Sequence, residues 1–113
     1  MSTRCNIHFA YGPDEPPKAN IYRHSDGYPK GVLPDLDTFF AEVEAQTRDT
    51  RFNDPSYLAA KFVVWQAGQN ARGGKPLDFI SLGITSEDAS DGEYVYTVTC
   101  RGPGRPTITH RKA

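Results

Sequence analysis

The sequence predicts an α+β domain whose elements follow in the order β-β-α-α-β-β. Three observations support this class. Apolar residues alternate in two segments near the start of the chain, recur at helical spacing in two middle segments, and alternate again in two later segments. Because the connections within each pair of strands are short, we expect a mostly antiparallel four-stranded sheet with two helices on one face.

The first pair of strands is expected over residues 5–11 and 19–24. Every second residue of the earlier segment is apolar or aromatic, which indicates a half-buried strand: Cys5, Ile7, Phe9 and Tyr11. The prolines between residues 12 and 18 lack a backbone N–H and therefore interrupt strand pairing. The turn Ser25-Asp26-Gly27 ends the later strand.

Two helices are expected in the middle of the chain. The apolar residues of the earlier helix fall at i, i+3, i+4 and i+7 and form one face: Leu36, Phe39, Phe40 and Val43. Pro34 suits the first turn of this helix. Asn53-Asp54-Pro55 predicts the start of the later helix, because an Asx residue caps a helix and proline suits its first position.

The second pair of strands is expected around residues 80–85 and 93–100. The later segment is rich in β-branched and aromatic residues and has the strongest strand signal in the chain. Tyr94 and Tyr96 share one face of it. They either cover the helices from the sheet side or form an exposed aromatic strip that suits stacking on bases or on a partner.

Residues 1–100 are expected to form a single domain, followed by a basic tail with glycines and prolines over residues 101–113. The chain of 113 residues is long enough for one hydrophobic core and too short for two. The tail holds four of the 13 Lys and Arg residues and no acid, which leaves nine cations against 14 acids in the remainder. Its stretch 107–110 is compatible with a short edge strand.

Composition limits the classes of function. The net charge of −1 provides no general attraction to nucleic acid or to an anionic membrane, so we expect nucleic-acid contact only through the basic tail. No apolar run approaches the roughly 18 residues that a membrane span needs. The first residues contain no apolar signal-peptide core. We therefore expect a cytoplasmic protein without a membrane partner.

Cys5 and Cys100 occupy apolar positions of strand-like segments, so we expect both to be reduced core residues. A zinc site or a disulfide framework would need more ligands or cysteines at close spacing. A few His and Asp residues from separate segments would bind a metal only if the fold brought them together: His8, His24 and His110, with Asp26 or Asp78. We expect no metal and no cofactor.

The densest cluster of chemically active side chains lies within residues 21–31, where a strand passes into a helix. Arg23 could hold a phosphate or carboxylate through two N–H groups, and His24 could donate to an anion or abstract a proton. Asp26 could orient the imidazole of His24, and Tyr28 adds a phenol. These four residues are the candidate ligand-binding or partner-binding site. The alternative is a structural turn in which Asp26 binds the backbone.

Several segments resemble one group of proteins. Ser2-Thr3-Arg4-x-x-Ile7 and Tyr22-Arg23-His24-x-Asp26-Gly27-Tyr28-Pro29-x-Gly31-Val32 resemble small uncharacterised proteins of phages, prophages and bacteria. Asn53-Asp54-Pro55-x-Tyr57-Leu58-Ala59-Ala60-Lys61 and Gly92-Glu93-Tyr94-Val95-Tyr96 are similar to the same group, so the resemblance spans most of the chain. It implies a phage or mobile-element context and a cytoplasmic product, and it supplies no catalytic residues.

The favoured function is that of a small, non-enzymatic accessory binding protein that captures a host protein or a nucleotide-like ligand. Tyrosine and arginine suit a nucleotide, because bases stack on the ring and the guanidinium binds phosphate with two hydrogen bonds. If the protein inhibits a host-defence system, its acidic body and basic tail would help to steer the partner.

Two other functions are compatible with these features. One is a small hydrolase or phosphodiesterase with His24 as acid and base, Asp26 as its orienting carboxylate and Arg23 as the electrostatic stabiliser. This mechanism needs a turn that brings the imidazole and the carboxylate within hydrogen-bond distance. The other is an oligomerising subunit, such as a homodimer, in which an exposed strand edge pairs with a second copy.

Overall fold

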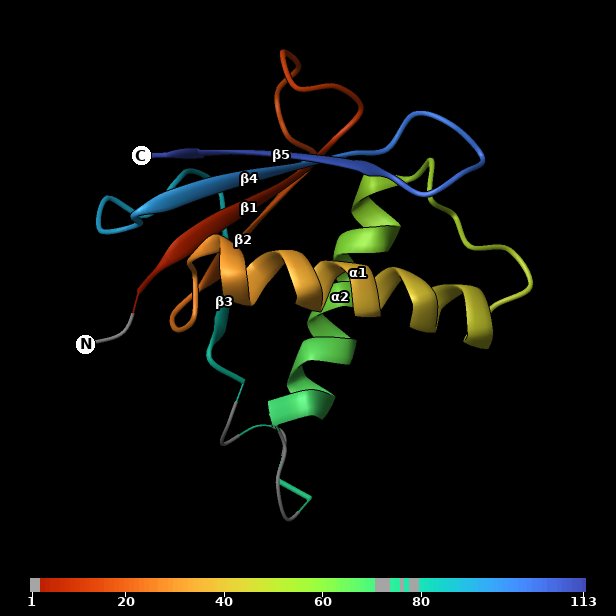
Figure 1. Cartoon of the computed structure of the whole chain (residues 1–113), viewed down its shortest axis with the longest axis horizontal. Coiled ribbons are helices and arrows are strands. Elements are labelled where there is room, and N and C mark those ends of the chain that lie inside the picture. The colour runs from red at the N-terminus through yellow and green to blue at the C-terminus, as the bar shows by residue number, and fades with distance from the viewer. Residues whose placement is uncertain (1–2, 71–73, 76, 78–79) are drawn as a thin grey trace.

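The computed structural model describes residues 3–70, 74–75, 77 and 80–113. Within these residues the chain forms two helices and a five-stranded sheet (Figure 1). In chain order the elements are β1 (Cys5–Ala10), β2 (Ala19–Arg23), α1 (Pro29–Gln46), α2 (Pro55–Asn70), β3 (Leu82–Thr85), β4 (Tyr94–Thr99) and β5 (Thr107–Lys112). The predicted α+β class is confirmed.

The sheet is mixed and has the strand order β3-β2-β1-β4-β5. β1 and β4 pair in parallel at its centre, and the other three pairs are antiparallel. The predicted antiparallel pair β1–β2 is confirmed, but the prediction of four strands and of a second hairpin was wrong. β3 and β4 do not pair with each other, because β3 adds to β2 while β4 crosses to the far side of β1. This arrangement gives the buried strand β1 a hydrogen-bonding neighbour on both sides.

The basic tail supplies the fifth strand. β5 pairs with β4 over six consecutive residue pairs and extends two residues beyond the stretch 107–110 that the sequence suggested. The loop before β5 is also attached to α1, because Arg105 lies 3.1 Å from an Asp37 oxygen and 2.6 Å from a Glu44 oxygen. The tail therefore belongs to the sheet and contacts the helix layer.

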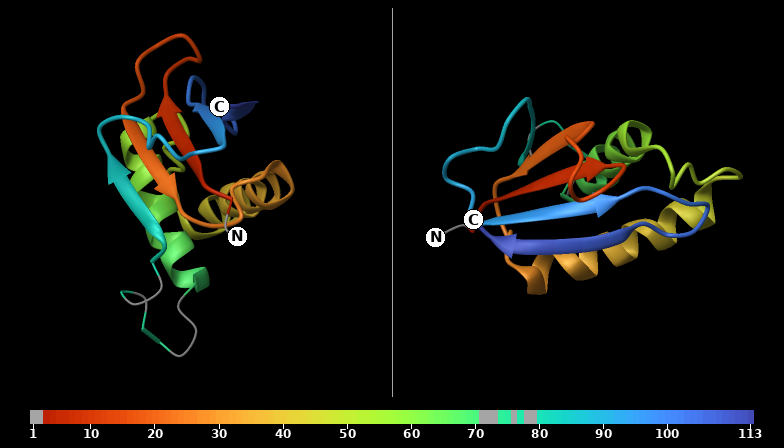
Figure 2. Two further views of the ribbon diagram at one scale, coloured as in Figure 1. Left: turned by 90° about the vertical axis from the view of Figure 1, so that its left-hand side faces the viewer. Right: turned by 90° about the horizontal axis from the view of Figure 1, so that it is seen from above.

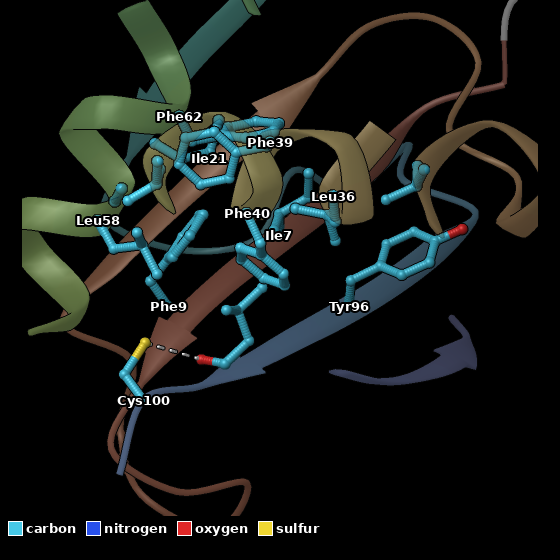
Figure 3. Close-up of a cluster of buried hydrophobic side chains, with 14 of the residues drawn as sticks. Ile7, Phe9, Ile21, Leu36, Phe39, Phe40, Leu58, Phe62, Tyr96 and Cys100 are labelled. Carbon is cyan, nitrogen blue, oxygen red and sulfur yellow. Dashed lines mark hydrogen bonds between the residues drawn. The ribbon is translucent and has the colours of Figure 1, made fainter. Parts of the chain in front are cut away.

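Both helices cover the same face of the sheet (Figure 2). Ile7 lies opposite Ile21 on β2 and Tyr96 on β4, so these three side chains point to one face. They form one core with buried residues of α1 and α2 (Figure 3): Leu36, Phe39, Phe40, Leu58 and Phe62. The single core is the physical reason that the two helices and the sheet fold as one unit.

Tyr94 and Tyr96 lie on the helix-covered face of β4. Tyr96 is fully buried, and the Tyr94 ring packs beside it with the ring centroids 6.4 Å apart. The interpretation of these residues as an exposed aromatic strip on the other face is therefore wrong. Their position follows from the register of β4 with β1, which places Tyr96 beside the core residue Ile7.

The two cysteines are free thiols in this core. The Sγ of Cys100 donates to the Val98 carbonyl at 3.7 Å (Figure 3). Burial raises the pKa of the Cys5 and Cys100 thiols to about 12. Both residues therefore contribute to packing as small apolar side chains rather than as reactive thiolates.

The turn between β2 and α1 is held tightly against the sheet. The buried hydroxyl of Tyr96 donates to the Gly27 carbonyl at 2.6 Å. Asp26 adopts a left-handed conformation with φ 54°, and a Cβ at Gly31 would lie 2.6 Å from the Asp26 carbonyl oxygen. α1 begins at Pro29, earlier than the apolar pattern suggested, so Pro34 lies inside the helix and the prediction that it occupies the first turn was wrong.

Candidate functional site

Arg23 lies at the end of β2 on the helix-covered face, and only 7% of its side chain is exposed. Its Nη2 lies 2.8 Å from Asp35 Oδ2, and its Nη1 donates to Gln66 Oε1 at 3.1 Å. Its Nε donates to the Ser25 carbonyl at 2.9 Å. The guanidinium therefore joins β2 to both helices and to the following turn.

His24 is exposed and lies in a polar cluster on the other face of the sheet. Its Nδ1 is 2.8 Å from the Tyr22 hydroxyl and accepts a longer bond of 3.4 Å from Arg4 Nε. Arg4 in turn forms an ion pair with Asp91 at 3.1 Å. His24 is thus one member of an exposed cluster formed by Arg4, Tyr22, His24 and Asp91.

Asp26 and Tyr28 form a separate exposed pair. The Tyr28 hydroxyl donates to Asp26 Oδ1 at 3.1 Å. This hydrogen bond and the negative charge of Asp26 raise the pKa of the Tyr28 phenol. The pair lies immediately before α1, where Tyr28 occupies the N-cap position of the helix.

The structure therefore does not bring all four predicted site residues into one cluster, although Arg23 and Asp26 line the same small hollow of about 90 Å³. Arg23 is turned towards the helices, His24 towards Tyr22, and Asp26 towards Tyr28. The physical reason is the period of a strand: consecutive side chains point to opposite faces, so Arg23 and His24 separate. The hydrogen bond between His24 and Asp26 that a hydrolytic mechanism requires is replaced by these other contacts.

A second polar group lies on the face of the sheet that the helices leave uncovered, and sequence analysis missed it. His8 Nε2 lies 2.5 Å from Asp88 Oδ1, and Asn20 Nδ2 donates to the same oxygen at 2.7 Å. Burial opposes the ionisation of Asp88, but the hydrogen bonds from His8 and Asn20 outweigh it and lower the pKa of the carboxyl. His8 and Asp88 are 80 residues apart, so no local spacing could have revealed their contact.

The register of the sheet extends this group into a polar row. One residue from each strand lies at the same level of the uncovered face: Thr85, Asn20, His8, Thr97 and Thr109. The loop of residues 86–92 crosses one part of this row. It is fastened there by Asp88 and by Ala89, whose N–H donates to Asn6 Oδ1 at 3.0 Å. The row is a structural support for that loop.

Metal binding was expected only if distant His and Asp residues met. Among the described residues, no three His, Cys, Asp or Glu side chains gather closely enough to hold a metal ion. His110 packs against Tyr96 on the helix-covered face, with ring centroids 5.6 Å apart, whereas His8 is on the uncovered face. Asp78 lies outside the described residues. No helix in the described ranges is long and apolar enough to cross a bilayer.

A hollow with a volume of about 550 Å³ lies between α1 and α2. Five apolar side chains line it: Phe39, Val43, Ala60, Val64 and Trp65. Val64 is 74% exposed and adds to the apolar surface of this hollow. A groove of this size with apolar walls is typical of a recognition site. We call it the α1–α2 groove.

The charges at the rim of the α1–α2 groove are already engaged in the fold. Lys61 Nζ donates to the Thr50 carbonyl at 3.2 Å, and Glu42 accepts a bond of 2.9 Å from Gln46. One acid and one cation at the rim give the groove little net charge. Its chemistry is therefore that of apolar contact rather than of anion binding.

A sequence signal for this groove was present. Residues 62–65 place four consecutive apolar side chains on one helix, a wider apolar surface than a single buried face needs. Phe62 is fully buried in the core, while Val64 projects into the groove. The exposed position of Val64 was not predicted.

Comparisons of the chain with known protein families, with curated proteins and with solved structures found no match.

Proposed function

We propose that this chain is a non-enzymatic binding protein that captures a protein partner in the α1–α2 groove. The observation that carries the proposal is the groove itself, which offers Phe39, Val43, Val64 and Trp65 as apolar walls. Burying such side chains stabilises a complex through the hydrophobic effect, and grooves between helices commonly accept the apolar face of a partner segment.

A protein segment fits this groove better than a nucleotide does. Nucleotide binding requires cations or free N–H donors for the phosphates. Among the described lining residues, Lys61 is the one cation, and its ammonium group is bonded to the Thr50 carbonyl. The proposal therefore favours the partner-protein form of the expected binding function over the nucleotide form.

The hydrolase alternative draws little support from the geometry. His24 would have to leave Tyr22 to reach Asp26, and Arg23 would have to leave Asp35 to stabilise a charge. Each change breaks a contact that is present in the folded state. We instead assign His24, Asp26 and Tyr28 to a second, smaller contact surface, because all three side chains are exposed.

The source of the partner rests on the resemblance alone. If the chain is a phage or mobile-element product, the partner is a cytoplasmic protein of the host, and a component of a defence system is one candidate. This part of the proposal is independent of the groove, because a partner from any source would use the same apolar contacts.

Two pairs of variants test the groove. Gly68 lines it, and a Cβ at this position would meet nothing within 4 Å, so Gly68→Leu fills the groove while Gly68→Ala leaves most of it open. Val64→Asp places a charge in the groove, and Ile84→Asp places one at a similarly exposed position on β3 (74% and 78% exposed). Gly68→Leu and Val64→Asp should weaken the complex by about tenfold or more, and their controls should not.

The measurement combines capture and fluorescence. Immobilised protein is incubated with cell lysate, captured proteins are identified by mass spectrometry, and the purified candidate is titrated against each variant. Trp65 is the single tryptophan and lines the groove, so occupation should shift its emission. A partner bound equally by the wild type and by Gly68→Leu, without a change in Trp65 emission, would place binding elsewhere and disprove the proposal.

A further inference from the structure

The outer edge of β5 differs from the opposite edge of the sheet. β5 is six residues long, contains no proline or glycine, and pairs with β4 without interruption. β3, at the other edge, has only four residues and includes Gly83. A long and regular strand edge is a template for pairing with another strand, because its outward N–H and C=O groups are unpaired.

The hydrogen bonds at the strand ends identify the outward groups of β5. Cys100 N–H donates to the Ala10 carbonyl at 2.8 Å, so the even-numbered residues of β4 turn towards β1 and the odd-numbered ones towards β5. Ala113 N–H donates to the Glu93 carbonyl at 2.9 Å, which agrees with this alternation. The residues of β5 that direct their N–H and C=O groups outward are therefore Ile108, His110 and Lys112.

We propose that β5 pairs in an antiparallel manner with β5 of a second copy of this chain, with Thr109 opposite Thr109 on the two-fold axis. Ile108 then lies opposite His110 of the second copy, and these two residues exchange backbone hydrogen bonds. Thr107 lies opposite Arg111. The two five-stranded sheets would join into one, and the proposal does not depend on the α1–α2 groove.

The side chains of β5 favour a second copy in this register. Its two permanent cations, Arg111 and Lys112, lie at one end of the strand, so an antiparallel partner places its own cations at the opposite end. The two Arg111 residues are four residues apart along the pair, about 13 Å. If the two-fold axis passed through His110 instead, the two Arg111 residues would lie only two residues apart along the paired strands. The central Thr109 pair is of a type that stabilises adjacent strands.

Lysine and arginine at a sheet edge can also prevent pairing. In β5 these charges lie beyond His110, so residues 107–110 contain no lysine, arginine or acid. An acidic strand of another protein is the competing occupant of the edge, and the experiment below separates it from a second copy.

Sedimentation velocity of the full chain, over about 1 to about 200 µM, tests the dimer. His110→Pro removes one outward N–H of β5, and the control Ile84→Pro removes one outward N–H of β3 at the other edge. Ile84 faces outward because the His24 N–H donates to the Ser81 carbonyl, so the odd-numbered residues of β3 face β2 and the even-numbered ones face away from it. His110→Ala removes only the ring. We expect a dimer for the wild type, His110→Ala and Ile84→Pro, and a dissociation constant about tenfold higher or more for His110→Pro.

Cysteine cross-linking tests the register. Thr109→Cys should form a disulfide-linked dimer under mild oxidation, because opposed Thr109 residues would be close neighbours. Thr97→Cys lies one strand further in and should not. The native Cys5 and Cys100 are buried and should not interfere.

A wild type that is monomeric at every concentration overturns the proposal. A dimer that dissociates in Ile84→Pro but not in His110→Pro also overturns it, because pairing would then use β3. A dimer in which Thr109→Cys fails to cross-link overturns the proposed register. A monomer that instead binds a synthetic peptide of alternating Glu and Val, and loses it in His110→Pro, shows that the edge takes an acidic strand and also overturns pairing with a second copy.

Discussion

The hydroxyl of Tyr96 donates to the Gly27 carbonyl at 2.6 Å inside the protein, and this bond fastens the β2–α1 turn to the central part of the sheet. Tyr96 is fully buried, and this burial is the main reason that the pKa of its phenol is raised. The turn that sequence analysis chose as a site is thus held by a residue 69 positions away.

Replacing Tyr96 by phenylalanine should destabilise the fold by about 1–2 kcal/mol, because the buried Gly27 carbonyl loses its donor. Urea unfolding followed by circular dichroism measures the change. Tyr94→Phe is the matched control, since the Tyr94 ring lies beside Tyr96 and its hydroxyl makes no hydrogen bond to the described residues. Equal stabilities of the two variants would contradict the prediction.

Replacing Arg23 by methionine should lower the free energy of unfolding by about 2–3 kcal/mol. The change leaves Asp35, Gln66 and the Ser25 carbonyl without the guanidinium that joins them. The expected loss of unfolding free energy is smaller than for a fully buried ion pair, because 38% of the Asp35 side chain is exposed. Denaturant titration should show little change for the exposed control Arg48→Met.

The lowered pKa of Asp88 makes part of the stability depend on pH. The folded state binds the proton of this carboxyl less tightly than the unfolded state does, so the stabilisation is present above about pH 4 and is lost as the pH falls through the folded pKa. Asp88→Asn should therefore flatten the loss of stability between about pH 5 and about pH 3, by roughly 1 kcal/mol or less for this half-exposed group.

Urea unfolding at several pH values measures this effect. Asp14→Asn, in the exposed loop after β1, should keep the acid sensitivity of the wild type. If Asp88→Asn and the wild type lose stability in parallel on acidification, the contact of Asp88 with His8 and Asn20 does not contribute in solution.

Cys5 and Cys100 should resist alkylation in the folded protein. Burial raises the pKa of both thiols to about 12, so almost no thiolate exists at about pH 8. A chromogenic disulfide reagent should react slowly with the native chain and rapidly in denaturant, with a yield of two thiols per chain. Rapid reaction of either thiol without denaturant would show that its strand opens or that its burial is incomplete.

The local elements were predictable from the sequence because their signals are local. Alternation at Cys5, Ile7 and Phe9 marked a strand, and the spacing of Leu36, Phe39 and Val43 marked a helix whose buried face is the expected one. The topology was predicted less well. A short connection favours a hairpin, but β3 and β4 are instead separated by β2 and β1.

In the candidate site, too, the local positions of the residues were predicted and their long-range contacts were not. Local sequence placed Arg23, His24, Asp26 and Tyr28 together at a turn, and the structure does place them at the turn before α1. Their partners come from elsewhere in the chain: Asp35 and Gln66 for Arg23, and Arg4 for His24. Because the backbone alternates, neighbouring side chains reach different surroundings.

The sequence by itself determined the fold class, the presence of two helices, the start of α2, most strands and the burial of the two cysteines, since hydrophobic periodicity records which side of each element faces the core. Only the tertiary structure decided the parallel pairing of β1 with β4, the contact of His8 with Asp88, and the α1–α2 groove. These features join residues that are distant in the chain, and their geometry depends on how the packed elements meet rather than on any local pattern.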